Sequence, residues 1–191
     1  MQTRKIIIDC DPGIDDTLAL NLAIQSPAVE VVAITIVCGN VPVQIGVDNA
    51  FKCLERLGRL DIPVYVGADK PLHKPFVSAQ DTHGMDGLGD SHIPRYPLFN
   101  RHNNPPLIFL AATFSQPSDI SIIALGPLTN IATALQRNPD LGRTVPALFQ
   151  WVGPIRVTVT AHPLLNSTTG AIRMPHCWYS TNSIKRLKWL A

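Results

Sequence analysis

Short apolar runs rich in β-branched residues alternate with segments of helical spacing along the first 140 residues. The runs at 5–8, 29–37, 62–66 and 120–125 have the composition of buried parallel strands. Helices are predicted at 17–23, 44–58 and 106–115, and in a segment that opens at 126–130 and ends near 137. Strands that alternate with helices predict an α/β fold, in which helices flank a mainly parallel, Rossmann-like sheet.

Two stretches lack this regularity. Residues 69–105 are rich in Pro, Gly, His and Asp without a sustained period, and so long a loop in a compact domain is usually functional. From about residue 147 the alternation dissolves, apart from a candidate strand at 157–160.

The composition is that of one globular domain. The chain has 191 residues, 46% of them hydrophobic and 16% charged, which suffices for a real core and argues against disorder. Its apolar runs are too short to cross a membrane, and its N-terminus does not resemble a signal peptide. The four cysteines lack metal-type spacing, so we expect a reduced, cytoplasmic chain without a membrane partner.

The net charge of +2 conceals a break in composition. Residues 1–140 hold all 14 acidic residues and 10 Lys and Arg (10 − 14 = −4), whereas residues 141–191 hold six basic residues and no acid (+6). All three tryptophans also lie in this last stretch. A basic, aromatic tail is one way to bind nucleic acid, and we keep that as the less favoured alternative to a second explanation below.

Four aspartates crowd into eight residues, from Asp9 to Asp16, directly after the first predicted strand and before the first predicted helix. Carboxylates this close repel one another unless a cation lies among them, and hard divalent ions such as Ca²⁺ or Mg²⁺ suit oxygen ligands. Capping of the helix would explain only one of the four. A phosphatase of the HAD type also begins with a strand and DxD, but there Thr or Val usually follows, whereas here Pro12 and Gly13 do.

This opening resembles that of the inosine–uridine-preferring nucleoside hydrolase family, whose motif is DxDPGxDD. Three further segments agree in order and spacing: VCGN at 37–40, THGMDGLG at 82–89 and ALGPLTN at 124–130. The resemblance covers about residues 1–146, roughly the first half of a family member. It implies the nucleoside hydrolase fold with its C-terminal part missing, and commonly a homodimer or homotetramer.

The resemblance also implies a Ca²⁺ site. Asp11 and Asp16 would be ligands through their carboxylates, and Leu125 would be a ligand through its backbone carbonyl. Asp9 would orient the loop without touching the ion.

The implied reaction is hydrolysis of the N-glycosidic bond of a ribonucleoside. Asp11 would be the general base that activates water, and His83 would act near the base or leaving group. Asp15 and Asn40 would hold ribose hydroxyls. These residue types suit the chemistry, because carboxylates favour an oxocarbenium-like transition state and a cation lowers the pKa of bound water.

After residue 146 the chain departs from the family pattern. A member should continue with a strand ending near SMGG, then EFNxxxDPxA, and later a His-Asp pair whose Asp closes the Ca²⁺ site; residues 147–191 contain none of these. Reading codons one frame over, from the third base of each residue, permits EFNxxxDPxA at the family's spacing and forces Gly at 151–152 and Ala at 174–175. We therefore interpret residues 147–191 as an out-of-frame, poorly ordered tail behind a partial domain at 1–146.

Such a chain lacks part of the ion shell and of the ribose clamp. We expect it to fold poorly and to show little or no hydrolase activity. The alternative is a binding protein that retains a ribose or metal pocket without turnover.

Overall fold

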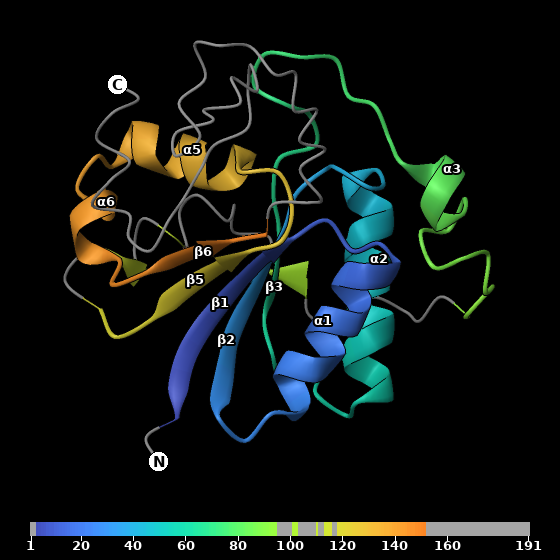
Figure 1. Ribbon diagram of the computed structural model, residues 1–191, viewed down its shortest axis with the longest axis horizontal. Coiled ribbons are helices and arrows are strands. Elements are labelled where there is room, and N and C mark those ends of the chain that lie inside the picture. The colour runs from blue at the N-terminus through green and yellow to red at the C-terminus, as the bar shows by residue number, and fades with distance from the viewer. Residues whose placement is uncertain (1–2, 95–100, 103–109, 111–112, 116–117, 152–191) are drawn as a thin grey trace, which may run out of the picture.

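A computed structural model describes residues 3–94, 101–102, 110, 113–115 and 118–151. Within these residues the core is one parallel sheet of six strands in the order β4-β3-β2-β1-β5-β6 (Figure 1). The strands are β1 (Arg4–Cys10), β2 (Val29–Ile36), β3 (Val64–Val66), β4 (Arg101–His102), β5 (Ser121–Ala124) and β6 (Leu148–Gln150). The expected parallel α/β architecture is confirmed.

One face of the sheet is covered by α1 (Ile14–Gln25) and α2 (Val43–Arg56). Alternate residues of the central strand β1, Ile6, Ile8 and Cys10, point into this layer, as the two-residue period of a strand requires. Their neighbours in the layer include Leu20 of α1 and Val47 of α2. A continuous apolar core therefore lies between this face and the two helices.

The opposite face is covered by α5 (Thr129–Arg137) and α6 (Leu141–Thr144), which lie on the other side of the sheet in Figure 1. Ile7 of β1 and Ile122 of β5 point into this second layer, where they meet Ile131 and Leu141. Both faces of β1 are thus buried, which explains why its centre, residues 6–8, is an unbroken run of isoleucines.

The helix and strand bounds agree with the sequence to within a few residues. The predicted helix at 44–58 is α2, the strand at 120–125 is β5, and the helix ending near 137 is α5. A short helix, α3 (Gln80–His83), lies within the long loop that the sequence left without structure. The predicted helix at 106–115 lies mostly outside the described residues, and the candidate strand at 157–160 lies wholly outside them.

The sheet continues past the boundary that the sequence placed at 147. Strand β6 pairs in parallel with β5, and Ile123 is opposite Phe149. Trp151 then donates its backbone N–H to the carbonyl of Ala124 at 2.8 Å. The regular fold of the described residues therefore extends into the first five residues of the predicted tail.

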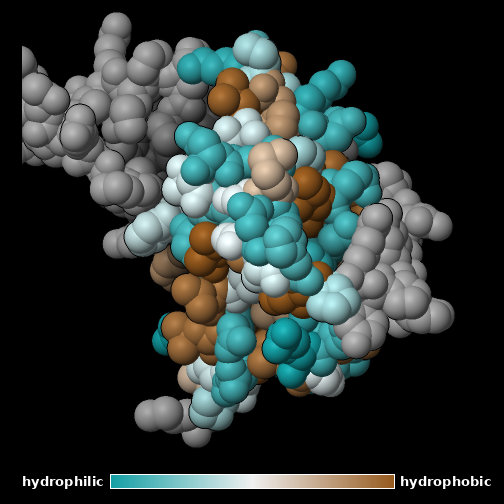
Figure 2. Space-filling view, turned by 90° about the vertical axis from the view of Figure 1, so that its right-hand side faces the viewer, coloured by the Kyte–Doolittle hydropathy of each residue, from teal (hydrophilic) through white to brown (hydrophobic). Residues whose placement is uncertain are grey.

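The outer side of α1 is less polar than that of an ordinary surface helix. Ile14, Leu18 and Leu22, spaced four residues apart, are all exposed, and Figure 2, which looks onto this side, shows apolar surface between hydrophilic groups. Among the helices of the described residues, none is long and apolar enough to span a membrane.

Two leucines of α1 allow a matched test of the core. Leu20 is 0% exposed and Leu22 is 74% exposed. We expect Leu20→Ala to lower the free energy of unfolding by about 2–5 kcal/mol, because it leaves a cavity. Leu22→Ala should change it by less than about 0.5 kcal/mol. Urea denaturation followed by circular dichroism measures both, and equal losses would contradict this account of the core.

Candidate active site

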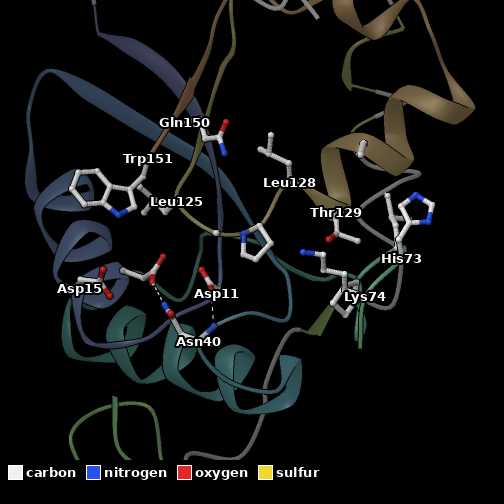
Figure 3. A pocket seen from close by; sticks show the side chains of 16 residues that line it. Asp11, Asp15, Asn40, His73, Lys74, Leu125, Leu128, Thr129, Gln150 and Trp151 are labelled. Carbon is white, nitrogen blue, oxygen red and sulfur yellow. Dashed lines mark hydrogen bonds between the residues drawn. The ribbon is translucent and has the colours of Figure 1, made fainter. Parts of the chain in front are cut away.

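The site lies where the order of the sheet reverses. From β1 the chain crosses to β2 on one side, whereas β5 and β6 lie on the other. Loops leave the carboxyl ends of β1 and β5 in opposite directions at such a point, and the crevice between them is where open α/β sheets bind ligands. Here the crevice is a cavity of about 430 Å³, shown in Figure 3.

The turn after β1 supplies Asp11 to this cavity, and the first turn of α1 supplies Asp15 and Asp16. Helix α1 begins directly after Gly13, whose carbonyl accepts hydrogen bonds from the backbone N–H (3.1 Å) and the hydroxyl (2.7 Å) of Thr17. The carboxylate of Asp16 faces the N–H of Gly13 at 3.5 Å. An acid at the third helical position is typical of a helix start, so local structure places Asp16 at the cavity.

Asn40 joins the two buried carboxylates. Its backbone N–H donates to Oδ2 of Asp11 at 2.6 Å, and its side-chain Nδ2 donates to Oδ2 of Asp16 at 2.8 Å. Both bonds are drawn in Figure 3. Asn40, a single residue in the loop after β2, therefore brings Asp11 and Asp16 to the same cavity.

Two glycines make room for Asp11. A Cβ on Gly39 would lie 1.9 Å from Oδ2 of Asp11, and a Cβ on Gly126 would lie 2.5 Å from its Oδ1. Real side chains do not approach so closely. The loops after β2 and β5 can therefore enclose this carboxylate only because both positions lack a side chain.

Burial makes these carboxylates reluctant to ionise. The pKa of Asp11 is raised from 3.8 to about 8, first by burial and then by the nearby charge of Asp16. The pKa of Asp16 is also raised, by burial and by the charge of Asp15. Each carboxyl is thus poised either to hold a proton or to meet a cation.

Asp9 lies behind the cavity, fully buried in a polar network. Its Oδ1 accepts hydrogen bonds from the hydroxyl of Thr35 and from Nδ2 of Asn130. Asn130 also donates to the carbonyl of Ile36 at 3.0 Å and accepts from the N–H of Ala68 at 2.9 Å. Burial raises the pKa of Asp9 to about 6 despite these bonds. Asp9 thus supports the loops and does not line the cavity.

The donor set fits part of a cation shell. Oδ1 of Asp16 is buried with no hydrogen-bond partner among the described residues, which suits an oxygen that meets an ion. Leu125, whose carbonyl the resemblance makes a ligand, lines the same cavity. No group of three or more His, Cys, Asp or Glu side chains in the described part of the chain could hold a metal by itself. The described residues therefore offer two carboxylates and a backbone oxygen, fewer than the roughly six to eight oxygens that Ca²⁺ takes.

The predicted substrate residues divide into two groups. Asp15 and Asn40 line the cavity together with Asp11 and Asp16. His83 is not among the lining residues; its Nδ1 accepts the backbone N–H of Ile14 at 3.2 Å and lies 3.9 Å from Oδ1 of Asp15. The structure thus places His83 against the α1 turn, and a direct role in catalysis stays a prediction that this placement does not favour.

Sequence reasoning missed several residues that build the site. Thr35 was read only as part of a strand, and Asn130 only as part of a motif, although both bind Asp9. Lys74 lines the cavity from the long loop, where nothing distinguishes it from other loop lysines. Asn49 is fully buried in α2, and the available signal was a polar residue between the apolar positions of that helix.

The sheet and the carboxylates at its switch point define an α/β protein with a small-molecule site lined by acidic side chains. Residues 6–161 match the model of the family described as inosine-uridine preferring nucleoside hydrolase. The chain belongs to this family.

Relatives named for their activities agree with this assignment. The Arabidopsis thaliana protein named "Probable uridine nucleosidase 2" is 37% identical over 166 residues, which is 84% of this chain and 50% of that protein. The pyrimidine-specific ribonucleoside hydrolase RihA of Salmonella typhimurium is 41% identical over 137 residues, 71% of this chain and 44% of that protein. The purine-preferring ribonucleoside hydrolase from Gardnerella vaginalis superposes with a TM-score of 0.74 at 32% identity, over 79% of this chain and 49% of that structure. The chain spans about half the length of the curated relatives it matches.

The raised pKa of Asp11 makes stability depend on pH in a metal-free buffer. Its folded-state pKa of about 8 lies above the unfolded value of 3.8, so between these values the unfolded chain ionises and the folded chain does not. Rising pH therefore favours unfolding. We expect Asp11→Asn to remove this penalty, so that its stability relative to wild type increases by about 1–4 kcal/mol from pH 5 to pH 8.

Urea denaturation with EDTA at several pH values measures the difference. Asp119→Asn is the control, because the Asp119 side chain is 71% exposed and its ion pair with Lys5 (3.4 Å) lies at the surface, so its difference from wild type should vary much less with pH than that of Asp11→Asn. A flat difference for Asp11→Asn over the same range would show that Asp11 ionises normally in the folded protein.

Proposed function

We propose that this chain carries the cation-binding and ribose-binding half of a nucleoside N-ribohydrolase site, which releases base and ribose from a ribonucleoside. The observation that carries the proposal is the convergence of Asp11 and Asp16 on one cavity, held together by Asn40. We propose Ca²⁺ as the cation, with Asp11, Asp16 and the Leu125 carbonyl as its ligands from this chain. When bound, such an ion orients a water molecule and lowers its pKa.

Asp11 is proposed as the general base that takes a proton from this water. A general base must be ionised before it can accept a proton, and a cation bound beside Asp11 would favour the ionised form of its carboxyl. The hydrogen bond from the Asn40 N–H to Oδ2 fixes the orientation of the carboxylate. Oδ1 of Asp11 lies beside Gly126, where an added Cβ would be 2.5 Å from it. A side chain at position 126 would therefore displace the carboxylate.

Asp15 and Asn40 are proposed to hold the ribose. Asp15 reaches the cavity from the first turn of α1, and Asn40 reaches it from the loop after β2. Their negative and polar oxygens would lie close to the positive charge that builds up on the sugar as the bond to the base breaks. In this proposal the described residues contact the sugar. Because the relatives differ in base preference, we propose ribonucleosides as the substrate class and name no particular base.

We propose that the 191-residue chain itself binds Ca²⁺ and ribose but hydrolyses nucleosides slowly or not at all. Its relatives are about twice as long, and most of the out-of-frame tail that we propose at 147–191, from residue 152 on, lies outside the described part. The incomplete ion shell supports the second candidate, a ribose- and metal-binding protein without catalysis. Both candidates share the same cavity and differ in whether hydrolysis follows binding.

Calorimetry with Ca²⁺ and a hydrolysis assay on uridine and inosine separate the candidates. We expect Ca²⁺ binding to wild type, and loss of at least about tenfold in affinity in Asp16→Asn, because a neutral amide replaces a charged ligand. Asp119→Asn should bind as wild type does. Release of reducing sugar should be slower by at least about 100-fold than in a full-length relative, since part of the transition-state stabilisation is missing.

Ordinary turnover by the purified chain would refute the incomplete-site proposal. Wild-type affinity for Ca²⁺ in Asp16→Asn would refute the cation site itself. Binding of Ca²⁺ and ribose without any sugar release would favour the non-catalytic alternative.

A further inference from the structure

We propose that Asn49 is a positioning residue that locks the turn at 11–14 (the aspartate turn) to the loop at 80–92. Asp15 and His83 are thereby placed as one unit. The functional meaning of this lock rests on the proposed nucleoside hydrolase site. The lock itself is a matter of contacts between described residues and can be tested without any catalysis.

Asn49 connects three segments that are far apart in sequence. It lies on α2, is 0% exposed, and uses one side-chain nitrogen for two bonds. Nδ2 donates to the carbonyl of Pro12 at 3.0 Å and to the carbonyl of Asp86 at 2.8 Å. On its other side, Oδ1 accepts from Nζ of Lys52 at 3.4 Å. A buried amide with all its polar atoms in use fixes the relative position of its partners.

The loop that Asn49 holds is a closed structure around the side chain of Asp86. This carboxylate accepts backbone N–H groups from Leu88 (2.7 Å), Asp90 (2.9 Å) and His92 (3.2 Å). The N–H of Gly89 returns to the carbonyl of His83 at 2.7 Å. Holding the Asp86 carbonyl therefore holds the whole loop, including His83.

Gly87 shows how closely the loop is applied to α2. Its φ of +73° favours glycine, and an added Cβ would lie 2.7 Å from Val41 and 2.8 Å from Nδ2 of Asn49. A side chain at this position would push the loop away from Asn49. The contact thus requires both the amide on α2 and a glycine on the loop.

The second half of the lock is at the start of α1. Pro12, the other partner of Asn49, follows Asp11 directly, and His83 accepts the N–H of Ile14 on the far side of the same turn. The aspartate turn is therefore gripped between Asn49 and His83. A cavity whose carboxylates must stay within a fraction of an ångström of their working positions needs such support.

Hydrogen exchange of the 191-residue protein tests the lock. In Asn49→Leu, which keeps the size of the side chain and removes its donors, the amides of Leu88, Gly89, Asp90 and Ile14 should exchange at least about tenfold faster. Amides of the central sheet, such as those of Ile8 and Ile34, should keep their protection. Gly87→Ala disrupts the same contact from the loop side, and it should make the same amides exchange faster.

The ring of His83 gives a second measurement that a purely structural role would not change. Its Nδ1 accepts a hydrogen bond, so the neutral ring carries its proton on Nε2, and ¹⁵N NMR should report this single tautomer in wild type. Asn49→Leu should produce a mixture of tautomers, whereas the control substitution Asn21→Leu, on the outer part of α1, should not.

The outcomes are distinct. Selective release of the loop and the α1 start supports the lock, whether or not the protein binds Ca²⁺ or hydrolyses nucleosides. Unchanged exchange in both Asn49→Leu and Gly87→Ala overturns it. An equal loss of protection in loop and sheet in both variants also overturns it, because Asn49 would then stabilise the fold in general.

Discussion

The structure depends on the cost of burying two carboxylates side by side. Asp11 and Asp16 are each about 5% exposed or less, and their charges oppose each other across a site from which water is largely removed. Asn40 offsets part of this cost by donating to both. The two glycines that let the loops close around Asp11, and the helix start that presents Asp16, are consequences of the same arrangement.

Carboxylates can be held this way only by a rigid support. The network of Asp9, Thr35 and Asn130 joins β1, β2 and α5 directly beneath the cavity. Because Asn130 also binds the carbonyl of Ile36 and the N–H of Ala68, the ends of β1, β2 and the segment after β3 are fixed relative to one another. Polar groups buried in the centre of an apolar sheet thus set the geometry at the carboxyl ends of its strands.

The sequence predicted what is local and could not predict what is distant. Apolar periods gave the strands and helices, since both faces of β1 and one face of α2 are buried. The density of aspartates gave Asp11, Asp15 and Asp16, which do share one cavity. The partners Thr35 and Asn49 were not found, because their roles follow from contacts 26 and 37 residues away in sequence. His83 was placed near the substrate by its motif, whereas its contacts turn it toward Ile14.

The boundary of the partial domain shows the same limit. Composition changes near residue 141 and the resemblance stops at about 146, yet β6 pairs with β5 at 148–150 and the family model matches as far as residue 161. Strand pairing needs only backbone groups and a suitable apolar side chain, such as the buried Leu148. Strand pairing therefore continues into residues whose sequence departs from the family motifs.

The proposed ion site has a physical consequence for the chain that carries it. A cation between Asp11 and Asp16 would attract both carboxylates and offset their mutual repulsion. Without one, the same burial raises their pKa values and opposes folding increasingly as the pH rises above the unfolded value of 3.8. If the proposal holds, stability and ion occupancy are linked through these two side chains, because a ligand that binds only the folded chain stabilises it.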